Sequence, residues 1–197
     1  LVLVDGAFAA KLSDPGAEKG LRIRPLRDAL EDDALQAQLL SLDIANPMVA
    51  LNSALLTDGV VIEIADGTVL SQPLHIVHIA AGATASSMFT RSLLRLGRNA
   101  SATLVESYVA GDGAKGYQAH DSLVIAIGDS SRLDHVRFVE DAADAVNISS
   151  AVVTLGAHAH FNTFGLTSGA SVSRYQATIA FAGEGSKVET NGVNLLK

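Results

Sequence analysis

The stretch LRLGRNASAT (residues 94–103) recurs in altered form three times toward the C-terminus. The later copies are IAIGDSSRLD (residues 125–134), VTLGAHAHFN (residues 153–162) and AFAGEGSKVE (residues 180–189). Their glycines, Gly97, Gly128, Gly156 and Gly183, are 31, 28 and 27 residues apart. Self-similarity at a nearly constant period of this length is typical of a solenoid in which each repeat forms one turn.

The residues around these glycines alternate in character. The positions three and one before the glycine are apolar: Leu94 and Leu96, Ile125 and Ile127, Val153 and Leu155, Ala180 and Ala182. The position four after it is mostly polar, with Ser101, Arg132, His160 and Lys187, and the position five after it is apolar, with Ala102, Leu133, Phe161 and Val188. This pattern predicts two short strands joined by a glycine corner, whose inward side chains stack on their equivalents one turn away.

Residues 1–57 have a different pattern. Val2 to Val4, followed by Asp5-Gly6, predicts a short strand and a turn. Apolar residues at helical spacing predict one amphipathic helix over residues 26–39, and Asn46-Pro47 predicts the start of a second helix that ends near Leu55. We therefore expect a mixed α/β segment over residues 1–57 and a mainly β parallel solenoid, a β-helix, over residues 58–197, with Val69 beginning one of its strands.

The composition excludes several classes of function. A net charge of −7 without a basic stripe argues against binding nucleic acid or an anionic membrane. The chain has no cysteine, so it cannot supply a thiolate to zinc or to an iron–sulfur cluster. No apolar run approaches the roughly 20 residues of a membrane span, and no signal peptide is visible, so we expect a cytoplasmic protein.

Three histidines are candidates for chemistry. His158 and His160 lie two residues apart, a spacing at which two imidazoles on one strand can bind one metal ion. The repeat places His158 in a corner and His160 in the polar column, however, which favours an incidental, solvent-facing pair. His135 shares its column with Thr163 and Thr190, so we expect it to point inward as a buried imidazole bonded to Thr163, with proton handling as the alternative.

Two other motifs have simpler interpretations. His120, Asp121 and Ser122 are consecutive, and neighbours in a strand point to opposite faces, so we do not expect a catalytic triad. The glycines of residues 111–116 match the spacing of a dinucleotide-binding loop, but a strand-like segment follows them instead of a helix, which indicates a loop. No catalytic residue is predicted.

Several short segments of the sequence resemble sequence motifs of the SufB/SufD family. They are ALNSA (residues 50–54), TDGVVIEI (residues 57–64) and DGTVLSQPLHI (residues 66–76), with further similarity in VLVDGAF (residues 2–8) and ETNGVNL (residues 189–195). The resemblance covers essentially the whole chain and is most specific over residues 50–76. The absence of cysteine favours a SufD-like protein, because the cluster chemistry of SufB relies on cysteine.

The resemblance implies a right-handed parallel β-helix and a non-catalytic scaffold role in iron–sulfur cluster assembly. It implies a SufB-like partner and a SufC-like ABC ATPase that docks on a helical domain C-terminal to the β-helix. The cluster is expected at the partner interface, with no cofactor bound by this chain alone. The chain is expected to be a fragment that stops inside the β-helix, so that the functional histidine of the family lies beyond Lys197.

Two alternatives remain open. A β-helix polysaccharide lyase or hydrolase, or another β-helix binding protein, would use the polar outer column that contains Arg132, His160 and Lys187. Open coil ends would expose strand edges, so a homodimer is also a possible state.

Overall fold

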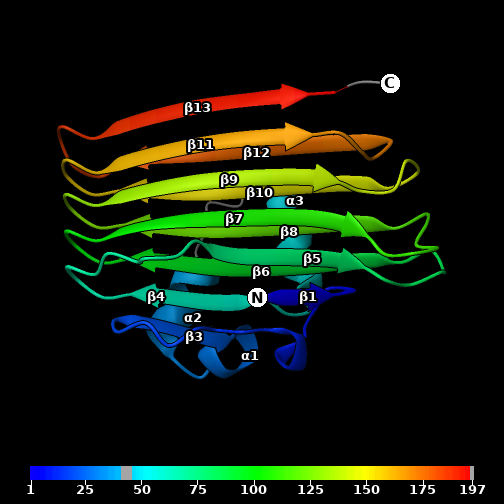
Figure 1. The fold of residues 1–197 in the computed structure, drawn as a ribbon, viewed down its shortest axis with the longest axis horizontal. Helices are drawn as coiled ribbons and strands as arrows, with labels where there is room; N and C mark the ends of the chain where they lie inside the picture. The colour runs from blue at the N-terminus through cyan, green and yellow to red at the C-terminus, as the bar shows by residue number, and fades with distance from the viewer. Residues whose placement is uncertain (41–45, 196–197) are drawn as a thin grey trace.

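The described residues, 1–40 and 46–195 of a computed structural model, form a β-solenoid of five turns built from two parallel sheets (Figure 1). Each turn places one strand in each sheet. The pairs are β4 (Val60–Ile64) with β5 (Leu74–Ala80), β6 (Ser87–Leu96) with β7 (Ser101–Ala110), β8 (Gln118–Ile127) with β9 (Arg132–Glu140), β10 (Val146–Leu155) with β11 (His160–Thr167), and β12 (Val172–Phe181) with β13 (Lys187–Asn194). The prediction of a mainly β parallel solenoid is confirmed.

The repeat columns of the sequence correspond to hydrogen-bonded neighbours in the sheets. In the sheet that contains β7, β9, β11 and β13, Ser101 pairs with Arg132, Arg132 with His160, and His160 with Lys187. The predicted column of polar residues is therefore a real ladder along the outer wall.

The other sheet departs from the predicted columns in its last turn. Leu155 pairs with Phe181, and Val153 pairs with Ile179, so the placement of Ala182 and Ala180 in these columns was wrong by one residue. The reason is the length of the corner, which spans residues 182–186 between β12 and β13 but only residues 156–159 between β10 and β11.

The N-terminal segment extends both sheets. β1 (Val2–Val4) pairs in parallel with β5 and in antiparallel with β2 (Ala7–Phe8), and β3 (Leu21–Pro25) pairs in antiparallel with β4. A short 3₁₀ helix covers Ala10–Leu12. Val69 begins no named strand and makes only an isolated bridge to Ser101.

Three helices follow β3: α1 (Leu26–Ala29), α2 (Asp33–Leu40) and α3 (Pro47–Leu55). The prediction of one continuous helix over residues 26–39 was wrong. Asp32 interrupts it, because its carboxylate accepts hydrogen bonds from the backbone nitrogens of Ala34 and Leu35 and so begins a new helix. Asn46 caps α3 in the same way, through Met48.

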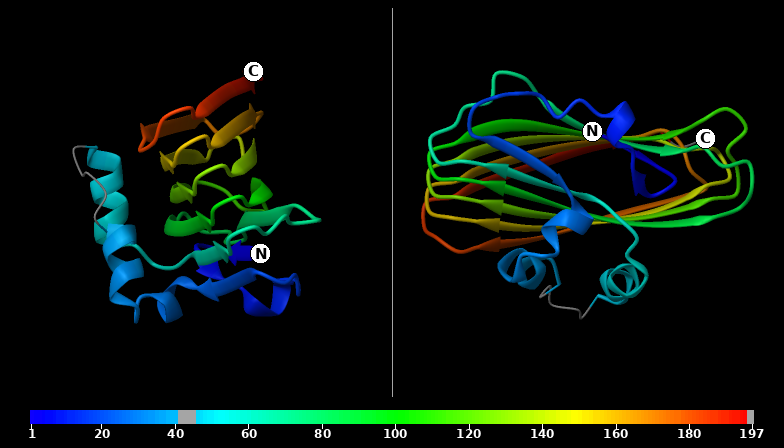
Figure 2. Two further views of the ribbon diagram at one scale, coloured as in Figure 1. Left: turned by 90° about the vertical axis from the view of Figure 1, so that its left-hand side faces the viewer. Right: turned by 90° about the horizontal axis from the view of Figure 1, so that it is seen from below.

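The helices lie along the outer face of the sheet that contains β4, β6 and β8 (Figure 2). Arg91 of β6 holds them there: fully buried, it donates to the carbonyl oxygen of Leu39 in α2 at 2.9 Å and to the hydroxyl of Ser53 in α3 at 2.8 Å. Asn52 of α3 donates to carbonyl oxygens in β6 and β8 and accepts from Arg91. Among the described residues, no helix has the length and apolar character needed to cross a membrane.

The four repeat glycines stand where successive turns approach most closely. A methyl group on Gly128 would lie 2.8 Å from the backbone nitrogen of Arg98, and one on Gly183 would lie 2.4 Å from that of Ala157. Carbon atoms cannot approach a backbone nitrogen so closely, so any larger residue would push two turns apart. Glycine is required here for proximity, not for backbone torsion.

This contact predicts that Gly128→Ala destabilises the protein by about 1–3 kcal/mol, the usual cost of overfilling a packed site. Gly165→Ala is the matched control, because an added methyl group at Gly165 meets nothing within 4 Å. Thermal unfolding of the two variants measures the difference. Equal melting temperatures would contradict the tight stacking of the corners.

Candidate functional site

The interior of the solenoid is divided into an apolar half and a polar half. Near the glycine corners it is filled by aliphatic and aromatic residues such as Leu94, Ile125, Leu133 and Phe161, all nearly or fully buried. At the opposite end of the strands the inward positions are polar, and they include Thr90, Glu106, Tyr108, Asp121, His135, Arg137, Asn147 and Ser149. We call this set the polar bore.

Strand alternation explains how these side chains reach the interior. Glu106 and Tyr108 continue the inward series of β7 that begins with Ala102 and Leu104, and Asp121 belongs to the inward series of β8. Their columns are formed by neighbouring turns: Glu106 pairs with Arg137, and Asp121 pairs with Thr90. The polar bore is thus a regular product of the repeat.

His135 lies in the polar bore, 1% exposed. Its Nδ1 is 3.1 Å from the hydroxyl of Thr163, as the column predicts, and its Nε2 is 2.8 Å from Oε2 of Glu106. Because an ionised carboxylate only accepts hydrogen bonds, Nε2 is the donor to Glu106 and Nδ1 accepts from Thr163 when the ring is neutral. The contact with Glu106 was not foreseen. A proton-handling role of His135 stays a prediction.

Asp121 is held from two sides. Thr90 donates to its Oδ1 at 2.5 Å, and the phenol of Tyr108 donates to its Oδ2 at 2.9 Å. Tyr108 also stacks on His78, with ring centroids 4.4 Å apart. The guanidinium of Arg137 lies 4.5 Å from the centre of the Tyr108 ring and donates hydrogen bonds to Ser149 and Asn147. The network therefore spans the bore from one sheet to the other.

The pKa values of Glu106 and Asp121, the two carboxyl groups of the polar bore, shift in opposite directions. Burial raises the pKa of Asp121, and the negative charge of Glu106 adds to this effect. Burial opposes ionisation of Glu106 as well, but the bond from His135 and the positive charges near it prevail, so the pKa of Glu106 lies below its ordinary value. Glu106 thus ionises more readily than Asp121, and Asp121 keeps a proton more readily than Glu106.

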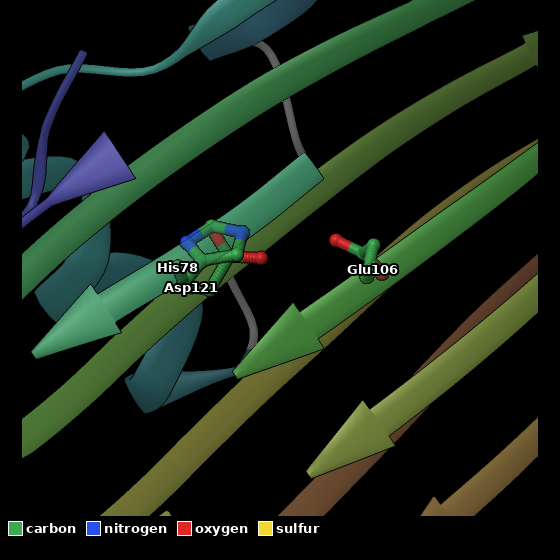
Figure 3. Close-up of side chains that lie close together, drawn as sticks. All are labelled: His78, Glu106 and Asp121. Carbon is green, nitrogen blue, oxygen red and sulfur yellow. The ribbon is translucent and has the colours of Figure 1, made fainter. Parts of the chain in front are cut away.

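His78, Glu106 and Asp121 come together in this region (Figure 3). One potential ligand atom from each lies within 4.8 Å of the others, although the residues belong to β5, β7 and β8. Among the described residues, this is the group of three or more potential metal-binding side chains that the fold assembles. The arrangement is suited to binding a cation or passing a proton.

The candidate pair His158 and His160 lies on the outside. Both residues are exposed, His158 occupies a corner with a left-handed φ of 56°, and neither belongs to the assembled group. His120 is likewise separated from Asp121: its ring stacks on Phe89, whereas Asp121 faces inward.

His78 is the residue that sequence reasoning missed. Its strand neighbour His75 faces outward, and the spacing within one strand gives no reason to connect His78 with Glu106 or Asp121. The available signal was the inward column that begins with Leu74 and Ile76 and includes His78.

The raised pKa of Asp121 predicts a pH-dependent effect of Asp121→Asn. Above the unfolded pKa of about 3.9, the folded protein retains a proton on Asp121 that the unfolded chain releases, so this group costs increasing stability as the pH rises toward its folded pKa. The neutral asparagine removes that cost. Urea unfolding should show the variant gaining stability relative to the unmodified protein between about pH 4 and pH 7. A relative loss over this interval would mean that the fold favours an ionised Asp121.

Comparison with known proteins agrees with this architecture. The family model described as SUF system FeS cluster assembly, SufBD core domain, matches residues 78–197. An iron–sulfur cluster assembly SufBD family protein of Synechocystis sp. (strain ATCC 27184 / PCC 6803 / Kazusa) is 25% identical over 154 residues, which cover 74% of this chain and 34% of the relative. The chain thus spans about a third of the length of that relative. Because the family match covers more than half of the chain and includes every turn from β6 onward, the chain belongs to the SufBD family of iron–sulfur cluster assembly proteins.

Proposed function

We propose that the protein acts as a non-catalytic scaffold subunit in cytoplasmic iron–sulfur cluster assembly, together with a SufB-like protein and a SufC-like ATPase. The observation that carries this proposal is the family match over residues 78–197, which include the last four turns of the solenoid, from β6 to β13. A rod with two regular walls offers an extended docking surface.

The absence of cysteine supports a division of labour. Iron–sulfur clusters are held by thiolates, and this 197-residue sequence has none. In the proposed complex, the SufB-like subunit therefore supplies thiolate ligands at the shared interface. The present chain contributes shape and outward side chains there, and the SufC-like subunit supplies ATP hydrolysis.

The charges of the outer column lend no support to a polysaccharide-cleaving enzyme. Arg132 forms an ion pair with Asp134 at 2.8 Å, and Asn162 donates to Asp134 at 2.6 Å. Two positions further along the ladder, Lys187 pairs with Glu189. These groups neutralise one another along the wall, whereas a lyase or hydrolase needs carboxylates and bases directed at a substrate.

Co-expression of the full-length protein with its SufB-like and SufC-like counterparts tests the proposal. We expect one complex of all three to survive affinity purification and size-exclusion chromatography at moderate salt. Recovery of this protein alone, as a monomer or as a homodimer that ignores the SufB-like protein, would contradict the proposal. Turnover of acidic polysaccharide by the isolated protein would contradict it as well.

The same complex tests the exposed histidine pair. His160→Ala should leave the iron content of the assembled complex unchanged, because His160 is a solvent-exposed member of the outer ladder. A large loss of iron, with the three subunits still associated, would show that the pair with His158 binds metal after all.

A further inference from the structure

We propose that His78, Glu106 and Asp121 bind one divalent first-row transition-metal ion inside the solenoid. This site is separate from the cluster chemistry of the family, and it stands on the geometry of the polar bore whether or not the scaffold proposal holds.

The distances are compatible with a shared ion. Bonds from Zn²⁺ or similar ions to imidazole nitrogen or carboxylate oxygen are about 2.0–2.2 Å, so two donor atoms on one ion lie at most roughly 4 Å apart. The ligand atoms of the three residues already lie within 4.8 Å of one another without an ion. Figure 3 shows the carboxyl group of Glu106 directed toward His78 and Asp121, so the remaining gap separates groups that face one another.

A second observation points independently to a missing ligand. Nε2 of His78 is buried and has no hydrogen-bond partner, which is rare for a buried polar atom. His78 and Asp121, with Thr90 and Tyr108 but not Glu106, line a cavity of about 20 Å³, so Glu106 would have to reach an ion there from beyond the cavity wall. This volume is slightly more than the space needed for one water molecule, so the cavity accommodates a single ion or a single water and nothing larger.

The surroundings position each of the three side chains. His135 donates to Oε2 of Glu106 at 2.8 Å, and Oε1 accepts only a long hydrogen bond, 3.4 Å, from the phenol of Tyr108. Thr90 and Tyr108 fix the two oxygens of Asp121, and Tyr108 holds the ring of His78 by stacking. Outer partners of this kind orient the ligands in natural metal sites and raise their affinity.

The donor set selects the class of metal. One imidazole with two carboxylates suits Mn²⁺, Fe²⁺, Co²⁺ or Zn²⁺, whereas Mg²⁺ and Ca²⁺ prefer oxygen alone and Cu⁺ prefers sulfur. Because imidazole and carboxylate ligands bind a metal ion in their deprotonated forms, affinity should rise with pH.

Titration calorimetry of the untagged full-length protein with Co²⁺ and Zn²⁺, after chelator treatment, tests the proposal. His78→Asn, Glu106→Gln and Asp121→Asn should each remove one equivalent of binding or weaken it by at least about tenfold, since loss of even an outer partner costs about 10–100-fold. Three variants keep the test decisive if one fails to fold, and His78 is the least buried of these positions. Thermal unfolding without metal verifies that the variants are folded.

The double variant His158→Ala/His160→Ala is the matched control, because it removes two exposed histidines outside the bore. This control should still bind the one equivalent of metal ion that the His78, Glu106 and Asp121 variants lose. Unchanged metal binding in all three single variants would overturn the proposal. Loss of one equivalent of bound metal in the double-histidine control, but in none of the single variants, would overturn it as well. Failure of the unmodified protein to bind either metal would overturn it too and would leave a water molecule as the occupant of the cavity.

Discussion

Backbone hydrogen bonding between parallel strands of successive turns is the interaction on which the rest of this structure depends. It fixes residues 26 to 32 positions apart as neighbours, as in the pairs Val146 with Val172 and Val61 with Leu93. A slip of one residue would reverse every side chain of a strand between interior and wall. The register therefore determines the apolar core, the outer ladder and the polar bore together, and the glycine corners allow the turns to approach closely enough to form it.

Filling the interior of the solenoid with polar side chains is energetically unfavourable. Burying Glu106, Asp121 and Arg137 costs solvation energy that hydrophobic residues in the same positions would not cost. The network reduces this cost, because His135 donates to Glu106, and Thr90 and Tyr108 donate to Asp121. It does not satisfy every atom, since Nε2 of His78 and Nε of Arg137 remain without a partner. A buried network that is incompletely satisfied indicates a function or an additional ligand rather than a contribution to stability.

The sequence predicted those features that depend on neighbours along one wall. The columns after each glycine were correct in all four copies, and so was the contact of His135 with Thr163, because alternation and repeat length define both. The break at Asp32 and the shift at Phe181 were missed, since a single cap and one extra corner residue do not alter the general pattern. The meeting of Asp121 with His78 and Glu106 could not be predicted, because Asp121 belongs to the other sheet and no spacing in the sequence measures the distance across the bore, whereas His78 and Glu106 lie on adjacent strands of one sheet. Residues in the segments that carry the family resemblance have structural roles. Asn52 connects α3 to two strands through hydrogen bonds, and Asp58 accepts hydrogen bonds from the backbone of Phe8 and the side chain of Arg27.

The register between turns can be measured directly by introducing cysteine pairs into a sequence that has none. Paired residues on adjacent strands lie about 5 Å apart, within the range of a disulfide, whereas residues two turns apart are separated by about 10 Å and are out of reach. After mild oxidation and peptide mass spectrometry, S101C/R132C should therefore yield an intramolecular disulfide, and S101C/H160C should not. A disulfide in the second pair but not in the first would contradict the stacking of turns on which the core, the outer ladder and the polar bore all depend.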